Sequence, residues 1–392
     1  MSQYLIENKD RNKTLIYDRT DVLSVSGEYG IVNQIEFQGR SFAGESVANY
    51  HIVETNDIVY TKSPLKANPY GIIKVNNGSP GIVSTLYAVY HPLQETEPQY
   101  VDYYFGNDLR LNKYLKPLVN IGAKHDMKVN NVTVLTGEVY FPSYEEQKKI
   151  ATFLAVLDKR IYKQRRLVDA LKKYKRGLSD KLFSENGATE DWTAIPFNEA
   201  FELLQNNTFS RNEMSTENGI VYNIHYGDVL IKYGAVVNLS KVEVPYIRPD
   251  VSLSKFAQHS YLRDGDIVIA DTAEDYTVGK AVEIAGINDA KALSGLHTIP
   301  CRPKLSFAPM YLGYFINSKR FRSQMLPLVQ GTKVSSISKS EILKTSVVFP
   351  SRQAQSKIAS MLYALDQKIN ICDACTRELV RAKEAMMQQL FI

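Results

Sequence analysis

The chain has 392 residues, of which 44% are hydrophobic and 23% are charged, as is typical of a soluble globular protein large enough for two or more domains. No apolar run approaches the roughly 20 residues of a transmembrane helix, and the polar N-terminus lacks the apolar core of a secretory signal. Three cysteines favour a reducing cytoplasm over a disulfide framework.

The net charge of +5 is distributed unevenly along the chain. Residues 1–143 and 185–350 each carry a net charge of −2, residues 351–392 carry +2, and residues 144–184 carry +7. A run of Lys and Arg on a helix is more often a solvated face than a binding site. The basic segment alone therefore does not predict a partner.

Residues 1–143 form the first predicted domain, which has an α+β pattern. The run Asp57-Ile58-Val59-Tyr60 predicts a strand, because it is short, apolar and bounded by turns rich in Gly, Pro and Asn. The spacing of apolar residues over Tyr103–Tyr114 predicts a helix.

Residues 144–184 predict one long helix. Pro142 precedes it, at a place where the fixed φ and the missing N–H donor of proline cost little. The helix has a heptad seam, and a stripe of this length must be buried against another helix. The seam residues are Leu154, Leu157, Ile161, Gln164, Val168, Leu171, Lys175, Leu178 and Leu182.

Residues 185–350 form the second predicted domain, which is also α+β. Asp266-Ile267-Val268-Ile269 and Val347-Val348-Phe349 predict strands, and Tyr311–Phe321 predicts a helix. The chain holds 25 tyrosines, and most of these rings are expected in the core or on half-buried strands rather than at a ligand.

Residues 351–392 repeat the first helix. Fifteen of the 43 positions from Phe141 to Phe183 are identical to those 208 residues further on, without a gap, which excludes chance. Weaker matches relate the domains, among them Asp57-Ile58-Val59 with Asp266-Ile267-Val268 and Tyr104-Phe105 with Tyr314-Phe315. The repeated seam consists of Leu362, Leu365, Ile369, Cys372, Thr376, Leu379, Lys383, Met386 and Leu390.

The two helices are each other's predicted partners. A whole domain connects them, so they can lie antiparallel, and the predicted fold is α+β. It has two α/β domains separated by two long antiparallel coiled-coil helices, with a pseudo-two-fold internal repeat. Gln164, Lys175 and Lys383 interrupt the seam, and we favour a role in register over the alternative of docking a partner. Cys372 and Cys375 lack a second ligand pair, so no metal site is predicted.

The helix strings are recognisable. FPSYEEQKKIATFLAVLDKRI with LVDALKKYKRGLSDKLF, and their second copies FPSRQAQSKIASMLYALDQKI with LVRAKEAMMQQLF, resemble the conserved region of type I restriction-modification specificity subunits. Trp192 to Glu202 and Tyr226-Gly227-Asp228-Val229 are also similar to that family. In one departure, residues 185–208 have no counterpart before Met1.

The resemblance implies a non-catalytic, cytoplasmic subunit with two target-recognition domains. Each domain would read one half of a bipartite site on double-stranded DNA. The helices, at about 57 Å for 38 residues, would set a spacer of the order of one to one and a half turns of DNA. They would bind two modification (adenine methyltransferase) subunits, which restriction subunits that translocate DNA would join. S-adenosylmethionine, ATP and Mg²⁺ would belong to those partners, with no cofactor or metal in this chain.

Cations in the polar loops of both domains are the candidate DNA contacts. Phosphate contacts would orient the protein, while Asn, Gln, Arg and Ser on the same loops would read base edges. Each cation alone is more often a plain surface residue. The candidates are Lys62, Lys66, Lys74, Lys124 and Lys128 in the first domain, and Lys232, Lys280, Arg322, Lys333 and Lys339 in the second.

Two other classes of function remain as alternatives. An enzyme would need a site, and the sequence has no GxxxxGK[ST] loop, while Asn68-Pro69-Tyr70 lacks the second proline of the adenine methyltransferase motif. A coiled-coil scaffold that binds no DNA would explain the helices. It would not explain why the two domains diverge in sequence while the helices that carry them are preserved.

Overall fold

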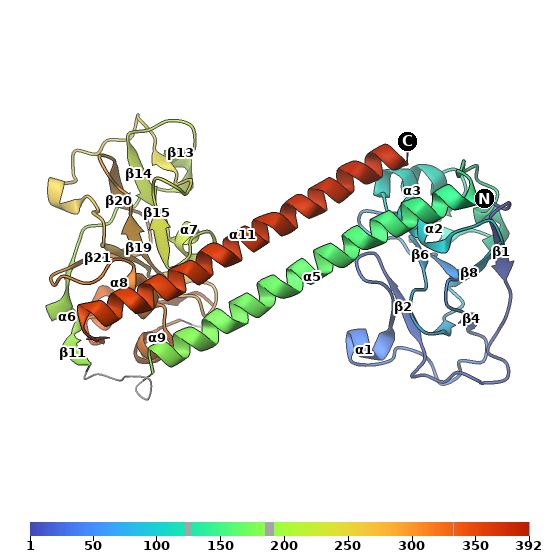
Figure 1. The fold of residues 1–392 in the computed structure, drawn as a ribbon, viewed down its shortest axis with the longest axis horizontal. Coiled ribbons are helices and arrows are strands. Elements are labelled where there is room, and N and C mark those ends of the chain that lie inside the picture. The colour runs from blue at the N-terminus through green and yellow to red at the C-terminus, as the bar shows by residue number, and fades with distance from the viewer. Residues whose placement is uncertain (122–126, 185–191, 332, 392) are drawn as a thin grey trace. The chain divides into compact units, whose positions relative to one another are not determined.

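The computed structural model describes residues 1–121, 127–184, 192–331 and 333–391 (Figure 1). The chain divides into two compact units: Met1–Lys163 with Thr376–Ile392 form the first, and Gln164–Cys375 form the second. The two long helices are α5 (Tyr144–Leu182) and α11 (Arg352–Leu390). Each unit thus combines one α+β domain with one half of each long helix.

Both long helices have 39 residues, which corresponds to about 58 Å at 1.5 Å per residue. A capping box begins α5: the Ser143 N–H and hydroxyl donate to the Glu146 carboxylate (3.1 and 2.8 Å), and the Glu146 N–H donates to Ser143 Oγ (3.4 Å). At α11, Ser351 Oγ accepts from the Ala354 N–H (3.4 Å). The recurring Pro-Ser therefore marks the start of each helix.

The halves of the two helices pair antiparallel within each unit. In the second unit Gln164 donates to the carbonyl of Cys372 (3.3 Å), and Lys175, further along α5, pairs with Asp366, earlier on α11 (2.5 Å). In the first unit Asp158 pairs with Lys383 (2.5 Å), while Phe391 at the end of α11 clusters with residues at the start of α5.

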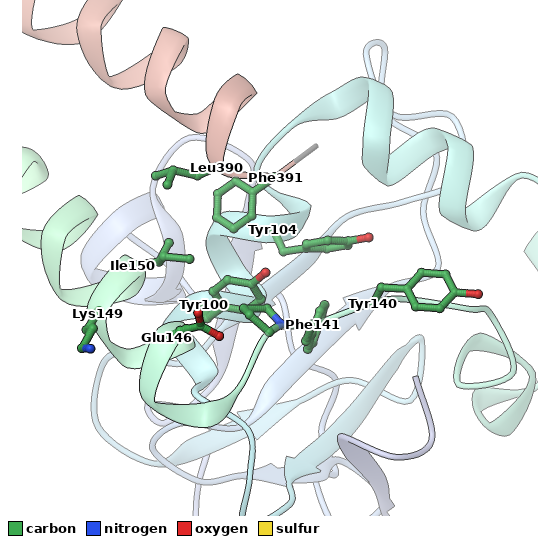
Figure 2. Close-up of a pocket in the computed structure, with 10 residues that line it drawn as sticks. Tyr100, Tyr104, Tyr140, Phe141, Glu146, Lys149, Ile150, Leu390 and Phe391 are labelled. Atoms are coloured by element: carbon green, nitrogen blue, oxygen red, sulfur yellow. The ribbon is translucent and has the colours of Figure 1, made fainter.

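The seam positions lie on the shielded side of both helices. All nine in α5 are buried or half-buried, from Leu154 at 0% exposed to the half-buried Lys175. In α11 the seam is shielded as far as Met386, but Leu390 is 39% exposed and its neighbour Phe391 is buried instead. Phe391, the last aromatic residue that the structure describes, therefore packs against the first domain (Figure 2).

The domain of the first unit is built on an antiparallel sheet with strand order β1-β8-β5-β6. Small two-stranded sheets (β2-β3, β4-β7 and β9-β10) flank it. The helices α2 and α3 share its core with β5, β6 and β8. The elements are β1 (Leu5–Asn8), β2 (Leu23–Ser26), β3 (Gly30–Asn33), α1 (Gln34–Gln38), β4 (His51–Val53), β5 (Ile58–Thr61), β6 (Ile73–Val75), β7 (Gly81–Val83), β8 (Tyr87–Pro92), α2 (Pro98–Phe105), α3 (Asp108–Leu115), β9 (Asn120–Ile121), β10 (Met127–Lys128) and α4 (Asn131–Val134).

The domain of the second unit contains a five-stranded sheet, β12-β21-β17-β19-β15, and a four-stranded sheet, β13-β16-β14-β20. Two strand pairs, β11-β23 and β18-β22, complete it. The elements are β11 (Thr193–Pro196), α6 (Phe197–Ala200), β12 (Phe201–Leu203), β13 (Met214–Ser215), β14 (Val221–Ile224), α7 (Tyr226–Ile231), β15 (Val236–Asn238), β16 (Tyr246–Ile247), β17 (Ile267–Ala270), β18 (Thr272–Ala273), β19 (Ala281–Ala285), β20 (Lys291–Ser294), β21 (Thr298–Pro303), α8 (Tyr311–Ile316), α9 (Lys319–Met325), β22 (Ser335–Ser336), α10 (Lys339–Ile342) and β23 (Ser346–Phe349).

Each helix predicted inside a domain is in fact two helices. The predicted helix over Tyr103–Tyr114 is interrupted where Asn107 caps α3, its Oδ1 accepting from the Arg110 N–H (3.1 Å). Ser318 caps α9 in the same way, with its Oγ accepting from the Phe321 N–H (3.4 Å). A capping residue has extended backbone, which ends one helix and starts the next.

The two caps correct the alignment of the repeat. Asn107 and Ser318 are 211 residues apart, whereas the sequence match of Tyr104 with Tyr314 implies 210. In the structure Tyr103 is the counterpart of Tyr314, because each hydroxyl donates to the same position on a long helix, Asp158 (2.8 Å) or Asp366 (2.7 Å). The sequence match is therefore wrong by one residue in this region.

These contacts form a repeated cluster, which we call the carboxylate clasp. It consists of Lys383, Asp158 and Tyr103 in the first unit and of Lys175, Asp366 and Tyr314 in the second. Each lysine also lies over the tyrosine ring, at 5.2 Å in the first clasp and 5.4 Å in the second. The clasp joins both long helices to the domain in each unit. The two seam lysines, Lys175 and Lys383, therefore form these contacts within this chain.

We predict that Tyr314→Phe destabilises the second unit by about 1–2 kcal/mol, because Asp366 loses a hydrogen bond while the ring stays packed. Tyr103→Phe is the matched change in the first unit. Urea unfolding, monitored by hydrogen exchange in each unit, measures both changes in stability. Equal protection of the two units in both variants would contradict the assignment of one clasp to each unit.

A buried acid, Glu283 on β19, caps α8. Its Oε1 accepts from the Met310 N–H (2.5 Å) and its Oε2 from the Gly313 N–H (2.9 Å). Burial raises the pKa of Glu283 to about 7, although these backbone hydrogen bonds oppose the shift. The folded state therefore holds a proton that the unfolded chain releases near its ordinary pKa of 4.5.

We predict that Glu283 contributes a loss of stability to the second unit as pH rises from about 4.5 to about 7, since only the unfolded state ionises Glu283 freely in this window, whereas His225, whose pKa is lowered to about 4, acts in the opposite direction. The loss is on the order of 3 kcal/mol at 1.36 kcal/mol per pKa unit. Urea unfolding across this range checks the slope. Glu283→Gln removes the Glu283 contribution, so its stability should rise more steeply with pH than that of the wild-type chain, and a variant with the wild-type slope would contradict the role of Glu283.

Candidate nucleic-acid interface

A positively charged cleft of about 900 Å³ opens in the second unit between α5 and the domain. Two carboxylates, Asp180 and Asp366, also line it. An excess of cations in a concave surface attracts a phosphate backbone. The cations are Lys172, Lys175, Arg176, Lys280, Lys319 and Arg322.

Three of the cations are held by the fold. Lys175 belongs to the clasp, and Lys280 donates to the carbonyls of Leu230 (2.9 Å) and Tyr233 (2.8 Å), where it caps the end of α7. Burial lowers the pKa of Lys280. Arg322 donates to the carbonyl of Tyr276 (2.6 Å). These residues give the cleft a fixed positive background, because their side chains are positioned before any ligand arrives.

The remaining three cations, Lys172, Arg176 and Lys319, are exposed. The ring of Tyr276 is beside them and is 90% exposed. A turn orders its loop, in which the Thr277 N–H donates to Asp275 Oδ1 (2.8 Å). Exposed cations next to an exposed aromatic ring are suited to contacts with phosphates and with nucleotide surfaces.

The loop that carries Tyr276 is connected to further candidate cations. It follows β18, which pairs with β22. Lys333 and Lys339 flank β22 and are both exposed, and the Lys339 ammonium donates to Asn206 Oδ1 (3.3 Å). Four of the five predicted cations of this domain therefore lie in the cleft or beside the β18-β22 strand pair, which precedes the Tyr276 loop.

Polar residues at one edge of this domain follow three strands, two in the four-stranded sheet and one in the five-stranded sheet. His225 follows β14, Asp271 follows β17, and His297 lies just beyond β20. The strands β14 and β20 are parallel, and the Asp271 N–H donates to the carbonyl of His297 (3.1 Å), so the three positions meet. His297 Nδ1 lies 3.4 Å from Asp271 Oδ1.

His225 is held neutral at this edge. Burial, and then the charge of Arg211, lowers the pKa of His225 to about 4, and its Nδ1 accepts from the Gly227 N–H (3.2 Å). Arg211 in turn pairs with Asp228 (2.8 Å). Because His225 is buried, the exposed side chains of Arg211 and His297 are the groups at this edge that are placed to meet base edges. This edge has no signal in the sequence, because its histidines lie 72 residues apart and are brought together only by the sheet.

The first unit gathers its candidate cations less closely. Burial, and then the charges of Arg11 and of the half-buried Lys62, lower the pKa of His51 to about 4. Lys74 pairs with Asp102 at 3.9 Å, and Lys66 is exposed.

Three other candidates lie apart from the cleft. Lys124 is outside the described residues, and Lys128 is described only as part of β10. Lys232 donates to the carbonyl of Glu243 (2.6 Å) and lines a different pocket of the second unit. DNA contact by each of the ten candidates stays a prediction.

A membrane-spanning helix and a metal site are not found in the described part of the chain. None of its helices combines the length and the apolar character needed to cross a membrane. None of its His, Cys, Asp and Glu side chains gather in threes as a metal site would require.

Comparison with known proteins gives one curated relative and several solved structures. No protein-family model matches the chain. The type I restriction enzyme MjaVIII specificity subunit of Methanocaldococcus jannaschii is 24% identical over 273 residues, which cover 64% of this chain and 61% of that protein. The matched part thus spans less than two thirds of this relative.

The solved structures cover almost the whole chain. The S subunit of a type I restriction-modification system from M. genitalium has a TM-score of 0.56 at 14% identity, over 99% of this chain and 94% of that one. A chain solved in work on complex assembly and conformational transition of the type I R-M system has a TM-score of 0.54 at 14% identity, over 99% and 95%. The predicted fold class and the resemblance found in the helix strings are thereby confirmed.

We predict that replacing Lys172, Arg176 and Lys319 together by Gln weakens binding to duplex DNA of any sequence. The slope of log affinity against log salt should fall by about 2–3, since about 0.9 is lost with each phosphate contact. Fluorescence anisotropy at several salt concentrations measures the slope. Lys368→Gln, an exposed change on α11 in the same unit, is the control. A triple variant with the slope of that control would exclude the cleft from DNA contact.

Proposed function

We propose that this chain is the DNA-specificity subunit of a type I restriction-modification enzyme, which reads a bipartite site on double-stranded DNA and has no catalysis of its own. One observation carries the proposal. Two units keep the same attachment to the long helices, through the carboxylate clasp, and differ in the polar surfaces that they present.

The difference is clearest in the basic cleft. At the positions 211 residues before Lys319 and Arg322, the first unit has Asp108 and Leu111. At the positions 208 residues after Lys172 and Arg176, α11 has Val380 and Glu384. Lys175 alone recurs among these helix cations, as Lys383 of the clasp. The attachment to the long helices is preserved while the domain surfaces differ. This supports two DNA-recognition domains for two different half-sites.

The long helices supply surface for protein partners. Outside the seam, α5 exposes Val156 (61%) and Tyr174 (61%), and α11 exposes Ile371 (68%). Apolar side chains on the outside of a helix pair favour docking of further helices or subunits. We propose that two modification subunits dock here and that restriction subunits join them. S-adenosylmethionine, ATP and Mg²⁺ would be bound by those subunits.

The alternative, a coiled-coil scaffold that binds no DNA, is not favoured. It would use the helices and their exposed apolar residues. It would have no use for a cleft with six cations, or for an edge where the exposed side chains of Arg211 and His297 lie beside His225.

The reader assignment is tested by exchanging one domain. With the modification subunit present, replacing residues 192–350 by the corresponding domain of a relative should change one half of the methylated sequence and leave the other half as it was. Sequencing of methylated adenines reads both halves at once. The exchange of residues 1–141 is the matched control and should change the opposite half. A site unaltered by both exchanges would refute the assignment.

The helices are proposed to set the spacer between the half-sites. Inserting one heptad after Val168 in α5 and one after Thr376 in α11, which occupy equivalent seam positions, keeps both seams in phase. Seven residues add about 10 Å, or about three base pairs. Methylated sites should then have a longer spacer by about that amount. An active variant that keeps the original spacer would exclude the helices from this role.

A further inference from the structure

One inner strand of each domain sheet, β5 in the first unit and β17 in the second, begins in the same way. Asp57 directly precedes β5 and Asp266 directly precedes β17. Each carboxylate accepts from the backbone N–H three residues earlier, that of Glu54 or of Arg263 (2.8 Å in both). The two strands then pair antiparallel with β8 and β21 in the same register. The backbone frame of the two domains is therefore equivalent along these ladders.

The same backbone hydrogen bond follows the last residue of each strand. In the first unit the Lys62 N–H donates to the carbonyl of Leu86 (3.4 Å), in the turn before β8. In the second unit the Asp271 N–H donates to the carbonyl of His297 (3.1 Å), in the turn before β21. Lys62 and Asp271 thus occupy one equivalent position, and Leu86 and His297 occupy another. We call these two sets of residues the strand-end pairs.

The strand-end pairs differ completely in chemistry. The first unit has a cation with an apolar side chain, and the second has an acid with an imidazole. Leu86 is 64% exposed, and the His297 side chain is 48% exposed. The strands that lead to these positions instead repeat the run Asp-Ile-Val. A role in folding would favour similar residues in the same frame, whereas recognition of two different ligands requires different ones.

The backbone of His297 supports a role beyond folding. Its φ is 54°, in the left-handed region that residues other than glycine rarely adopt. The hydrogen bond from Asp271 to its carbonyl holds this turn in place. The second domain therefore maintains an unfavourable conformation at the residue whose imidazole is exposed.

The strand-end pair of the second unit is close in the chain to the basic cleft. Asp271 precedes Tyr276, which lines the cleft, by five residues. Five residues span at most about 18 Å when extended. The major groove of DNA is about 12 Å wide. A phosphate backbone bound in the cleft therefore has base edges within reach of Asp271 and His297.

Contact with phosphates does not account for both strand-end pairs. Phosphates are negative in every DNA sequence, so a lysine suits them and a carboxylate repels them. Lys62 and Asp271 nevertheless occupy the same position of the frame. Base edges differ in this respect, because they present amino groups as well as acceptors and thymine adds a methyl group. Opposite charges at one position are thus explained by two different bases.

We propose that the strand-end pairs are specificity-determining residues, each of which reads adjacent base pairs of one half-site in the major groove. This inference rests on the proposed function and names the bases. Asp271 accepts from the amino group of a cytosine, and His297 contacts the same base pair beside it. Lys62 donates to a guanine, and Leu86 packs on the methyl group of a neighbouring thymine.

The test exchanges the pairs in the full-length chain bound to the modification subunit. Duplexes randomised at each position of the methylated site are selected by binding, and the bound fraction is sequenced. Asp271→Lys with His297→Leu should shift the base preference about tenfold at one or two adjacent positions of one half-site, away from cytosine and towards guanine and thymine. The reciprocal change, Lys62→Asp with Leu86→His, should alter the opposite half-site.

Asp289→Lys is the matched control. It makes the same charge change at an exposed residue of the same domain, before β20 rather than after it, and should leave every base preference as it was. Asp271→Asn and Leu86→Ala keep the size of the side chains equal or smaller, so they test the inference if an exchanged pair prevents folding. Asp271→Asn should move the preference from cytosine to adenine.

The outcomes separate this inference from the proposed function. Base preferences that are unchanged in both exchanged variants would overturn the inference, while a wild-type complex that selects a bipartite site would still support the proposed function. Uniformly weaker binding of all duplexes by Asp271→Asn and Leu86→Ala would also overturn the inference, because it would identify contacts without sequence preference. A wild-type complex that selects no sequence would refute the proposed function itself.

Discussion

The antiparallel pairing of α5 and α11 is the interaction on which the rest of the structure depends. Its seam is apolar over most of its length, and burial of such a stripe is the main stabilising contribution available to helices of this length. The polar residues that interrupt the seam favour the antiparallel orientation of the two helices. Because Lys175 meets Asp366 and Lys383 meets Asp158, a parallel arrangement or a shifted register would leave two carboxylates and two ammonium groups unpaired.

The carboxylate clasp connects this pairing to the domains. Burial and the neighbouring carboxylate raise the pKa values of Tyr103 and Tyr314, so both hydroxyls stay protonated and donate to the helix. The same three residue types thus orient each domain on its half of the helix pair. Mutations elsewhere on the domain surface leave this attachment untouched. That separation permits the loops to diverge, and it explains why the helices match closely while Lys172, Arg176, Lys319 and Arg322 of the basic cleft are not repeated at the equivalent described positions of the other unit.

The sequence predicted the long helices, their antiparallel pairing and the α+β domains, because a heptad seam and a 208-residue repeat are strong signals that survive without a structure. It did not predict the breaks at Asn107 and Ser318. A capping residue and a mid-helix residue of the same type are indistinguishable until the backbone is seen. Nor did it find the edge that joins His225, Asp271 and His297, since their proximity arises from strand order alone. Lys74 and Lys280 looked like loop cations, but their side chains are bound to Asp102 and to the end of α7.

The position of Phe391 has a consequence for how the molecule is made. This ring, near the last residue of the chain, packs into the aromatic cluster of a domain whose sheet begins at Leu5. The ribosome therefore releases the N-terminal domain before the helix half that completes it exists, while the second unit has all of its residues once Cys375 has emerged. Contacts over such a sequence separation form late and slowly. The domain made first is therefore completed last, because its aromatic cluster lacks one ring until Phe391 has been made.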